Sequence, residues 1–498
     1  MNLRISINKE LGLFVSAALA CFLGLAFYNN AMIMYSLIAV ECITLIVVLI
    51  SGKNELYLCL LLIFITMSQE FSYFLETNGS TVAIMYSFKE TRIAGLNLGL
   101  VFTGLFFVKL LMIDKSRTYI APSRYGKSFI RWLFVLAIIG IFVGAFNILI
   151  NDNNINGIPN VWFTFLQESS YGLFIAMLAY CTFFVLEVYG SRVLEKTLLT
   201  IMICNLLIPL FTNIMGIKGT YGGKELYLTL SSYILCMFIV ILPAYEKYKN
   251  KLIPYTTIAI IGVFYPLFFK SIAFGKMLLL IVVIIFLFFY IRSKQSITWF
   301  FMFVMLFIAA VVAWSYIVEY LTEHNSLFGY KYKQILSLLS IWNSGWYDNL
   351  LPSPKVRITE FINIVLEYVH KPWFVITGKG ILGSVKDYLQ DIPMFNLSVY
   401  SYNEFIIQSY YGMHETINIF FLQSGILGLT FLFKYLNILF INIRNNPWIA
   451  IGSVWLLLLW GYSVTRSTFG LVCLCLGLYL IGTENNDAQS RDVNICHD

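Results

Sequence analysis

The chain has 498 residues, of which 59% are hydrophobic and only 12% are charged. Soluble proteins carry roughly twice that share of charge, so the composition excludes a water-soluble globule. The formal net charge of +7 does not indicate nucleic-acid binding, because no basic stripe alternates with aromatic residues outside the apolar runs. A polytopic membrane protein is therefore predicted, crossing the bilayer in segments of about 20 residues each.

Long apolar runs, separated by polar segments, are the main pattern along the chain. They are continuously apolar rather than alternating, which favours membrane-spanning helices over the strands of a barrel. About fourteen helices are predicted, near residues 11–29, 31–50, 55–75, 93–113, 129–150, 162–188, 194–214, 225–244, 253–269, 272–291, 297–320, 415–440, 447–464 and 467–482. The predicted fold class is all-α, a polytopic transmembrane helical bundle.

This pattern divides the chain into segments with different expected locations. Transmembrane helices are expected over 1–320 and 413–483, a large loop over 321–412 and a polar tail over 484–498. Basic residues outside the large loop are concentrated on the side of the N-terminus, which predicts that both termini are cytoplasmic. The large loop would then face away from the cytoplasm.

The large loop has the composition of a folded subdomain rather than of a linker. Its apolar residues recur at helical spacing, for example over 335–346 and 358–366, so we expect amphipathic helices that lie on the outer membrane surface or over the bundle. One such helix is predicted around 360–368, with Ser353 or Thr359 as its cap.

Positive charges on the predicted outer side need an explanation, because topology disfavours them there. Outside the large loop, such positive charges include Lys218, Lys224, Lys270, Lys276 and Arg466. One explanation is snorkelling of single side chains to the interface. The other, taking the five together with Arg357, is an anionic ligand such as the diphosphate of a lipid-linked sugar.

His414, one of four histidines, is the candidate general base. It lies at the end of the large loop and at the predicted start of a helix, where its neutral form is favoured. The alternative is an interfacial histidine bonded to a neighbouring carbonyl. Glu360, one helical turn from Arg357, is expected to orient that guanidinium through an ion pair. Four tyrosines near His414 are candidates for stacking on sugars, namely Tyr400, Tyr402, Tyr410 and Tyr411.

The spacing His414, ten residues, Gly425, two residues, Gly428 resembles the signature of the O-antigen ligase and O-antigen polymerase superfamily. Arg357 followed by Phe361 resembles the Arg-x-x-x-Leu element of that family. Further similar elements are Pro372 with Gly378-Lys379-Gly380, and Lys270-Ser271 with Gly275-Lys276. Glu415 stands where the family usually has Asn, Ser or Gln, so this carboxylate would either raise the basicity of His414 or itself serve as the base.

The resemblance implies a GT-C-like bundle that acts as a membrane glycosyltransferase without a metal ion or other cofactor. It implies that Arg357 binds phosphate or the donor and that His414 activates the acceptor. Lys270, Lys276 and Arg466 would neutralise the undecaprenyl diphosphate, and the predicted diphosphate and substrate set also includes Lys218, Lys224, Lys379 and Tyr411.

Three functions remain open on the sequence. The favoured one is a surface-polysaccharide polymerase that acts on undecaprenyl-diphosphate-linked repeat units, and the number of predicted helices favours it over a ligase that transfers glycan to lipid A core. A transporter or flippase for a lipid-linked saccharide is the third. The partners implied are the lipid-linked oligosaccharide, the bilayer, a chain-length regulator and a flippase, with no nucleic acid.

Overall fold

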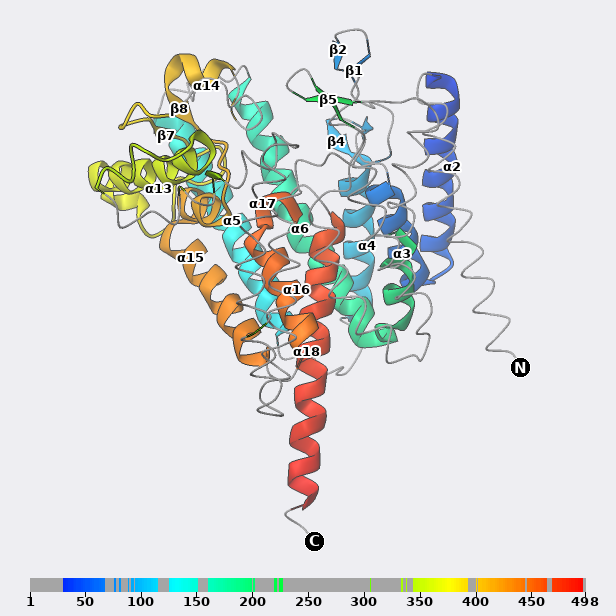
Figure 1. The fold of residues 1–498 in the computed structure, drawn as a ribbon. Helices are drawn as coiled ribbons and strands as arrows, with labels where there is room; N and C mark the ends of the chain where they lie inside the picture. The colour runs from blue at the N-terminus through cyan, green and yellow to red at the C-terminus, as the bar shows by residue number, and fades with distance from the viewer. Residues whose placement is uncertain are drawn as a thin grey trace. The chain divides into compact units, whose positions relative to one another are not determined.

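The computed structural model describes residues 30–67, 76–77, 80–81, 88, 91–93, 95–114, 125–150, 160–198, 200–201, 219–221, 224–226, 305, 333–334, 337, 344–392, 400, 402–443, 446–463 and 468–495. The described part is mostly helical, as predicted (Figure 1). It divides into one unit of 1–142, 162–271 and 431–498, and a second of 143–161 and 272–430. The predicted helices 11–29, 253–269 and 272–291 lie outside the described residues, as do nearly all of 225–244 and 297–320.

The N-terminal helices confirm several predicted runs. They are α2 (Ala31–Ile50), α3 (Asn54–Met67), α4 (Leu98–Asp114), α5 (Gly126–Ile150) and α6 (Val161–Tyr189). Asparagine side chains cap two of them, because their amide oxygens accept otherwise unpaired N–H groups of the first turn. The Oδ1 atom of Asn30 accepts from Ile33 N at 3.2 Å, and that of Asn97 accepts from Leu100 N at 2.8 Å. Residues 192–198 are also helical, at the start of the predicted 194–214 run.

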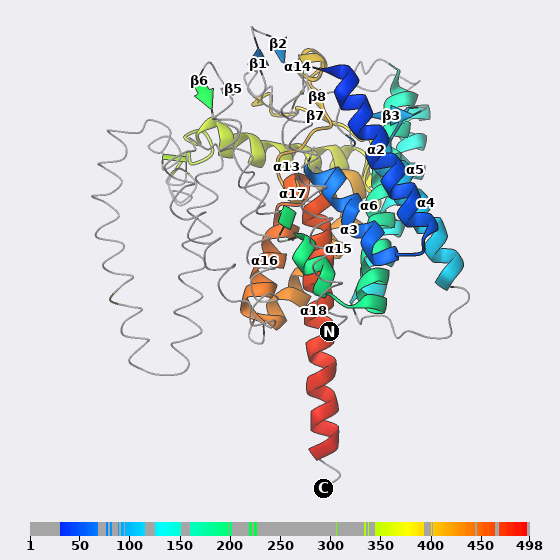
Figure 2. The same ribbon diagram turned by 90° about the vertical axis from the view of Figure 1, so that its right-hand side faces the viewer.

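The C-terminal helices are α15 (Thr416–Asn442), α16 (Pro447–Leu458), α17 (Trp460–Ser463) and α18 (Thr468–Ile495). The single helix predicted over 447–464 is divided at Leu459 into α16 and α17. The last predicted helix, 467–482, is longer than expected, because α18 continues through the polar tail as far as Ile495 (Figure 2). Helices α16 and α18 pack against each other within their unit.

Three of the described helices are long and apolar enough to cross a membrane, namely α5, α6 and α15. Shorter apolar helices accompany them over 35–50, 54–66, 98–113, 448–458 and 468–483. The long ones retain exposed apolar side chains such as Phe142 and Phe146 on α5. A bilayer accepts such side chains, whereas water does not.

Short antiparallel hairpins interrupt the helices and correct two predicted boundaries. The pairs are β1 (Glu76–Thr77) with β2 (Ser80–Thr81), β3 (Arg92–Ile93) with β4 (Leu96–Asn97), and β5 (Gly219–Tyr221) with β6 (Lys224–Leu226). The helix predicted over 93–113 therefore begins only at Leu98, after a hairpin. The predicted helix 225–244 likewise starts too early, because Glu225 and Leu226 belong to β6.

The described part of the large loop forms a small folded body around the helix α13 (Pro352–His370). It also contains the 3-10 turn η2 (Pro372–Phe374), the helix α14 (Tyr402–Ile407) and the strands β7 (Val385–Lys386) and β8 (Ser409–Tyr410). The β7–β8 pair joins Val385 to Tyr410 and Lys386 to Ser409. The buried core includes Ile364, Tyr368, Phe374, Val385, Tyr400, Phe405, Tyr410 and Leu422.

The start of α13 differs from the expected cap. The helix begins at Pro352, and its N-cap is Leu351, which makes no side-chain capping bond. Proline suits this position, because its fixed backbone angle is helical and the missing N–H would have no helical partner there. Ser353 and Thr359 therefore lie inside the helix, two and eight positions after the N-cap, and neither residue caps it.

A turn at residues 375–380 is inserted into a break in α15. The break is at Gly425, whose φ of 59° and ψ of −144° are not helical. Ile426 N donates to Val375 O at 2.9 Å, and Leu427 N donates to Ile376 O at 3.1 Å. In the other direction, Lys379 N donates to Leu422 O at 2.8 Å and Gly380 N donates to Gln423 O at 3.1 Å. The turn thus takes over the backbone partners that the break would leave unpaired.

Two glycines make this close approach possible. A Cβ atom on Gly378 would lie 2.3 Å from Ser424 N, and one on Gly425 would lie 2.4 Å from Val375 O. Both residues also have positive φ, which other residues rarely adopt. The Gly-x-Gly stretch and the first glycine after His414 therefore meet, although 47 residues separate their positions in the chain.

Candidate functional site

The buried face of α13 carries two carboxylates, and the first of them, Glu360, is the centre of the candidate site. Buried residues recur along the helix at Val356, Glu360, Ile364 and Glu367, the three-to-four-residue spacing of one helix face. Glu360 and Glu367 therefore lie two turns apart on the same side. A carboxylate taken out of water must be hydrogen-bonded or paired, and each of the two has its own group of donors.

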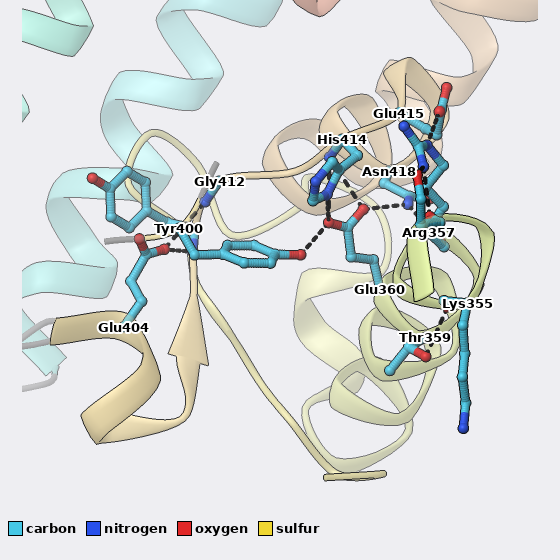
Figure 3. Close-up of polar contacts among 12 residues, drawn as sticks. Lys355, Arg357, Thr359, Glu360, Tyr400, Glu404, Gly412, His414, Glu415 and Asn418 are labelled. Carbon is cyan, nitrogen blue, oxygen red and sulfur yellow. Dashed lines mark hydrogen bonds and ion pairs between the residues drawn. The ribbon is translucent and has the colours of Figure 1, made fainter. Parts of the chain in front are cut away.

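Glu360 accepts hydrogen bonds from three residues. The Asn418 side-chain amide donates to Oε2 at 2.8 Å, the main-chain N–H of His414 donates to the same oxygen at 3.1 Å, and the Tyr400 hydroxyl donates to Oε1. The imidazole of His414 also contacts Oε1, with Nδ1 at 2.6 Å. Figure 3 shows His414, Tyr400 and Asn418 converging on this carboxylate. We call these four residues the Glu360 cluster.

The hydrogen bonds to Glu360 indicate which nitrogen of the His414 ring carries the hydrogen. The other contacts of this carboxylate come from donor groups, so Nδ1 of His414 is assigned as the N–H that donates to Oε1. Burial and the nearby charge of Glu360 raise the pKa of the Tyr400 hydroxyl, which keeps it a donor. The neutral imidazole then has its lone pair on Nε2. A carboxylate that fixes the ring in this way would also stabilise the imidazolium formed when the histidine takes up a proton.

Arg357 lies beside the Glu360 cluster but pairs with a different carboxylate from the one predicted. Its Nε donates to Glu415 Oε1 at 2.5 Å, and its Nη1 donates to the carbonyl and hydroxyl oxygens of Ser353 one turn earlier. The expected Arg357–Glu360 pair is therefore wrong. Spacing along α13 allowed that contact, but Glu360 is turned to the buried side, whereas Arg357 and Glu415 are partly exposed, at 28% and 45% of their side chains.

Asn418 connects the two groups. Its amide donates both to the main-chain oxygen of Arg357, at 3.0 Å, and to Glu360. Because Asn418 is one turn after His414 at the start of α15, the same helix end supplies the imidazole, the bridging amide and the Glu415 carboxylate. His414 and Arg357, predicted as base and phosphate ligand, are thereby brought together by α13 and α15 (Figure 3).

Glu404 on α14 holds the chain segment that leads into His414. Its Oε1 accepts the main-chain N–H of Tyr411 at 2.8 Å and that of Gly412 at 3.4 Å. Tyr411, predicted to contact substrate, is thus held through its backbone. The structure contradicts a sugar-stacking role for Tyr400 and Tyr410, because their rings are buried in the core of the loop body.

The second carboxylate, Glu367, binds cations. Lys379 Nζ lies 2.7 Å and Lys371 Nζ 2.9 Å from Oε1, and the Tyr388 hydroxyl donates to Oε2 at 2.7 Å. Burial alone would raise the pKa of Glu367, but the charge of Lys379 and these hydrogen bonds outweigh it and lower the pKa to about 2. We call these four residues the Glu367 cluster.

Lys379 has a different environment from the one that a diphosphate ligand requires. Its side chain is buried and also donates to the main-chain oxygen of Ser384. A diphosphate would have to displace Glu367 to reach it. The main-chain N–H of Lys379 donates to Leu422 O of α15. Lys379 therefore fixes the turn against both α13 and α15.

The side chains of the other predicted cations are outside what the structure describes. Lys218, Lys270, Lys276 and Arg466 lie outside the described residues. Lys224 is in β6, where the structure describes the backbone only.

Sequence reasoning missed Asn418 and Tyr400 as partners of Glu360. A signal for Asn418 was present, because a residue four positions after His414 on a helix lies on the same face. No local signal indicates Tyr400, which reaches Glu360 from a position 40 residues away. Comparison of the chain with protein-family models, with curated proteins and with solved structures gives no match.

Proposed function

We propose that this chain is a membrane glycosyltransferase that polymerises undecaprenyl-diphosphate-linked glycan repeat units at the periplasmic face of a bacterial inner membrane. The observation that carries the proposal is the junction of α13 and α15, where an imidazole oriented by a carboxylate adjoins a partly exposed arginine. The apolar helices α5, α6 and α15 support a membrane location. The motif resemblance around His414 supports the class of reaction.

In the proposed reaction, a sugar hydroxyl of a new lipid-linked unit attacks the anomeric carbon of the growing chain. The bond between that carbon and the diphosphate oxygen breaks, a glycosidic bond forms, and undecaprenyl diphosphate leaves. Nε2 of His414 takes the hydroxyl proton while Glu360 stabilises the resulting imidazolium. Arg357 stabilises the negative charge that develops on the leaving diphosphate.

The experiment uses purified full-length protein in lipid vesicles with a lipid-linked repeat unit. The wild type should make polymer, whereas His414→Ala and Arg357→Ala should make none. The matched controls are His370→Ala and Lys355→Ala, which remove another histidine and another cation from α13. The His370 ring contacts Leu366 O, and Lys355 pairs with Asp391, so neither side chain belongs to the site. Polymer formation by both site variants at the wild-type rate would refute the proposal.

The ligase is the closest alternative, because it would use the same groups on another acceptor. Cells that lack the gene separate the two on an electrophoretic ladder. Loss of a polymerase leaves a single repeat unit on the lipid A core, whereas loss of a ligase leaves the core bare. The first pattern is expected.

A further inference from the structure

The ion pair of Arg357 with Glu415 has the geometry of an occupied anion site. The guanidinium directs Nε to Glu415 Oε1 at 2.5 Å, while Ser353 accepts from Nη1. A carboxylate oxygen bound to an arginine in this way takes the position that a phosphate oxygen would take. Glu415 therefore serves as an internal anion at the one described arginine that adjoins the Glu360 cluster.

Exposure distinguishes this pair from the buried carboxylates nearby. The Glu415 side chain is 45% exposed, whereas those of Glu360 and Glu367 are fully buried. An ion pair exposed to water is weak, because water competes for both partners and the side chains lose freedom when they pair. Glu415 can thus leave Arg357 at little cost, and it can turn towards solvent without breaking the Glu360 cluster.

The local charge makes such a departure necessary for an anion to bind. With Glu415 in place, its carboxylate already balances the charge of the Arg357 guanidinium, so an incoming anion would meet a neutralised pair rather than a free cation. A singly charged anion gains about as much from Arg357 as Glu415 does, so exchange is not favoured. A diphosphate offers more charge and several oxygens to the same fork, so exchange becomes favourable.

We propose that Glu415 is a specificity-determining residue, an internal competitor at Arg357 that multiply charged phosphates displace and singly charged anions do not. This inference rests on the proposed function for the identity of the natural diphosphate. The binding property itself does not require glycosyl transfer, and it can be measured without any sugar substrate.

The experiment is calorimetric titration of the full-length protein in detergent with inorganic pyrophosphate, and separately with acetate, at fixed ionic strength without divalent metal. Glu415→Gln should bind pyrophosphate about fivefold more tightly than the wild type, the order expected for removal of an exposed pair. It should also show measurable acetate binding, so that selectivity for pyrophosphate falls. Arg357→Ala should bind neither anion.

A matched control is Asp391→Asn, which removes a carboxylate of similar exposure from Lys355, two residues before Arg357 on α13. It should leave pyrophosphate affinity unchanged. Glu415→Asp, whose shorter arm keeps the charge, should give an affinity between those of wild type and Glu415→Gln. The inference is overturned if Glu415→Gln binds pyrophosphate equally or more weakly, because Glu415 would then support the arginine rather than compete for it.

Failure of this inference and failure of the proposed function give different results. Polymer synthesis by the wild type, together with unchanged pyrophosphate affinity in Glu415→Gln, would remove the competitor role alone. Tighter pyrophosphate binding by Glu415→Gln in a protein that makes no polymer would leave the anion site standing and remove the glycosyltransferase assignment.

Discussion

Glu360 and Glu367 occupy equivalent positions two turns apart on the buried face of α13, but their partners differ in kind. Glu367 is surrounded by two ammonium groups and a hydroxyl. Glu360 is surrounded by an amide, a hydroxyl, a main-chain N–H and an imidazole. The first set fixes the carboxylate by charge, whereas the second contains an imidazole, a group that can accept and release a proton.

The comparison shows how one helix can carry both a structural and a chemical carboxylate. The buried ion pair of Glu367 with Lys379 holds the turn at 375–380 in place, and neutralising Glu367 would leave the buried charge of Lys379 uncompensated. At Glu360, neutral donors hold the carboxylate, so loss of its charge would strand no cation. The two clusters should therefore respond differently to the same Glu→Gln change.

Glu367→Gln should have the largest effect on stability. It leaves the buried ammonium of Lys379 without its counter-charge, which costs about 3–5 kcal/mol of folding free energy. The measurement is the denaturation midpoint of the detergent-purified protein. The double variant Glu367→Gln with Lys379→Met should recover part of the loss, and a midpoint equal to that of the wild type in the single variant would contradict the assignment.

Glu360→Gln should instead affect activity. The amide no longer fixes the imidazole with its lone pair on Nε2, so polymer synthesis should fall roughly 10²- to 10³-fold, within the range for general-base catalysis. The folding free energy should fall by about 1–3 kcal/mol, less than in Glu367→Gln, because the glutamine NH2 group leaves buried donors unpaired but strands no charge. A variant that loses stability as Glu367→Gln does, yet keeps its turnover rate, would reverse the roles of the two clusters.

Acid should act on the Glu367 cluster. The pKa of Glu367 is lowered from 4.5 to about 2 in the folded protein. A lowered pKa contributes stability that is fully present above about pH 4.5 and is lost as the pH falls towards 2, to a total of up to about 3 kcal/mol. Denaturation midpoints measured from pH 6 to pH 3 should fall more steeply in the wild type than in Glu367→Gln, and parallel curves would rule this out.

Tyr400→Phe should have the smallest effect. It removes one of several donors to Glu360, at a cost of about 1 kcal/mol. Turnover should fall about fivefold, because the carboxylate keeps its bonds from Asn418 and from both N–H groups of His414. A loss as large as that of Glu360→Gln would instead indicate that the hydroxyl takes part in the reaction.

The sequence predicted the helices that arise from local pattern. The apolar runs at 31–50, 129–150, 162–188 and 415–440 became α2, α5, α6 and α15 with bounds within a few residues. The position of His414 directly before a helix is likewise confirmed, because that helix begins at Thr416. These features depend on residues that are neighbours in the chain.

Contacts between distant residues were harder to predict. Spacing along a helix suggested Glu360 as the partner of Arg357, but tertiary packing placed His414, 54 residues away, against that carboxylate. The break at Gly425 was also not predicted. A glycine in an apolar run is compatible with a straight helix, and only the distant turn at 375–380 explains the bend.

The turn inserted in α15 has a consequence for how the chain tolerates change. Buried backbone groups without partners cost about 1–3 kcal/mol each, so the break in α15 and the turn that fills it have to be inherited together. A single residue added between Val375 and Gly380 would shift this turn out of register, and the backbone groups at the break in α15 would lose their partners.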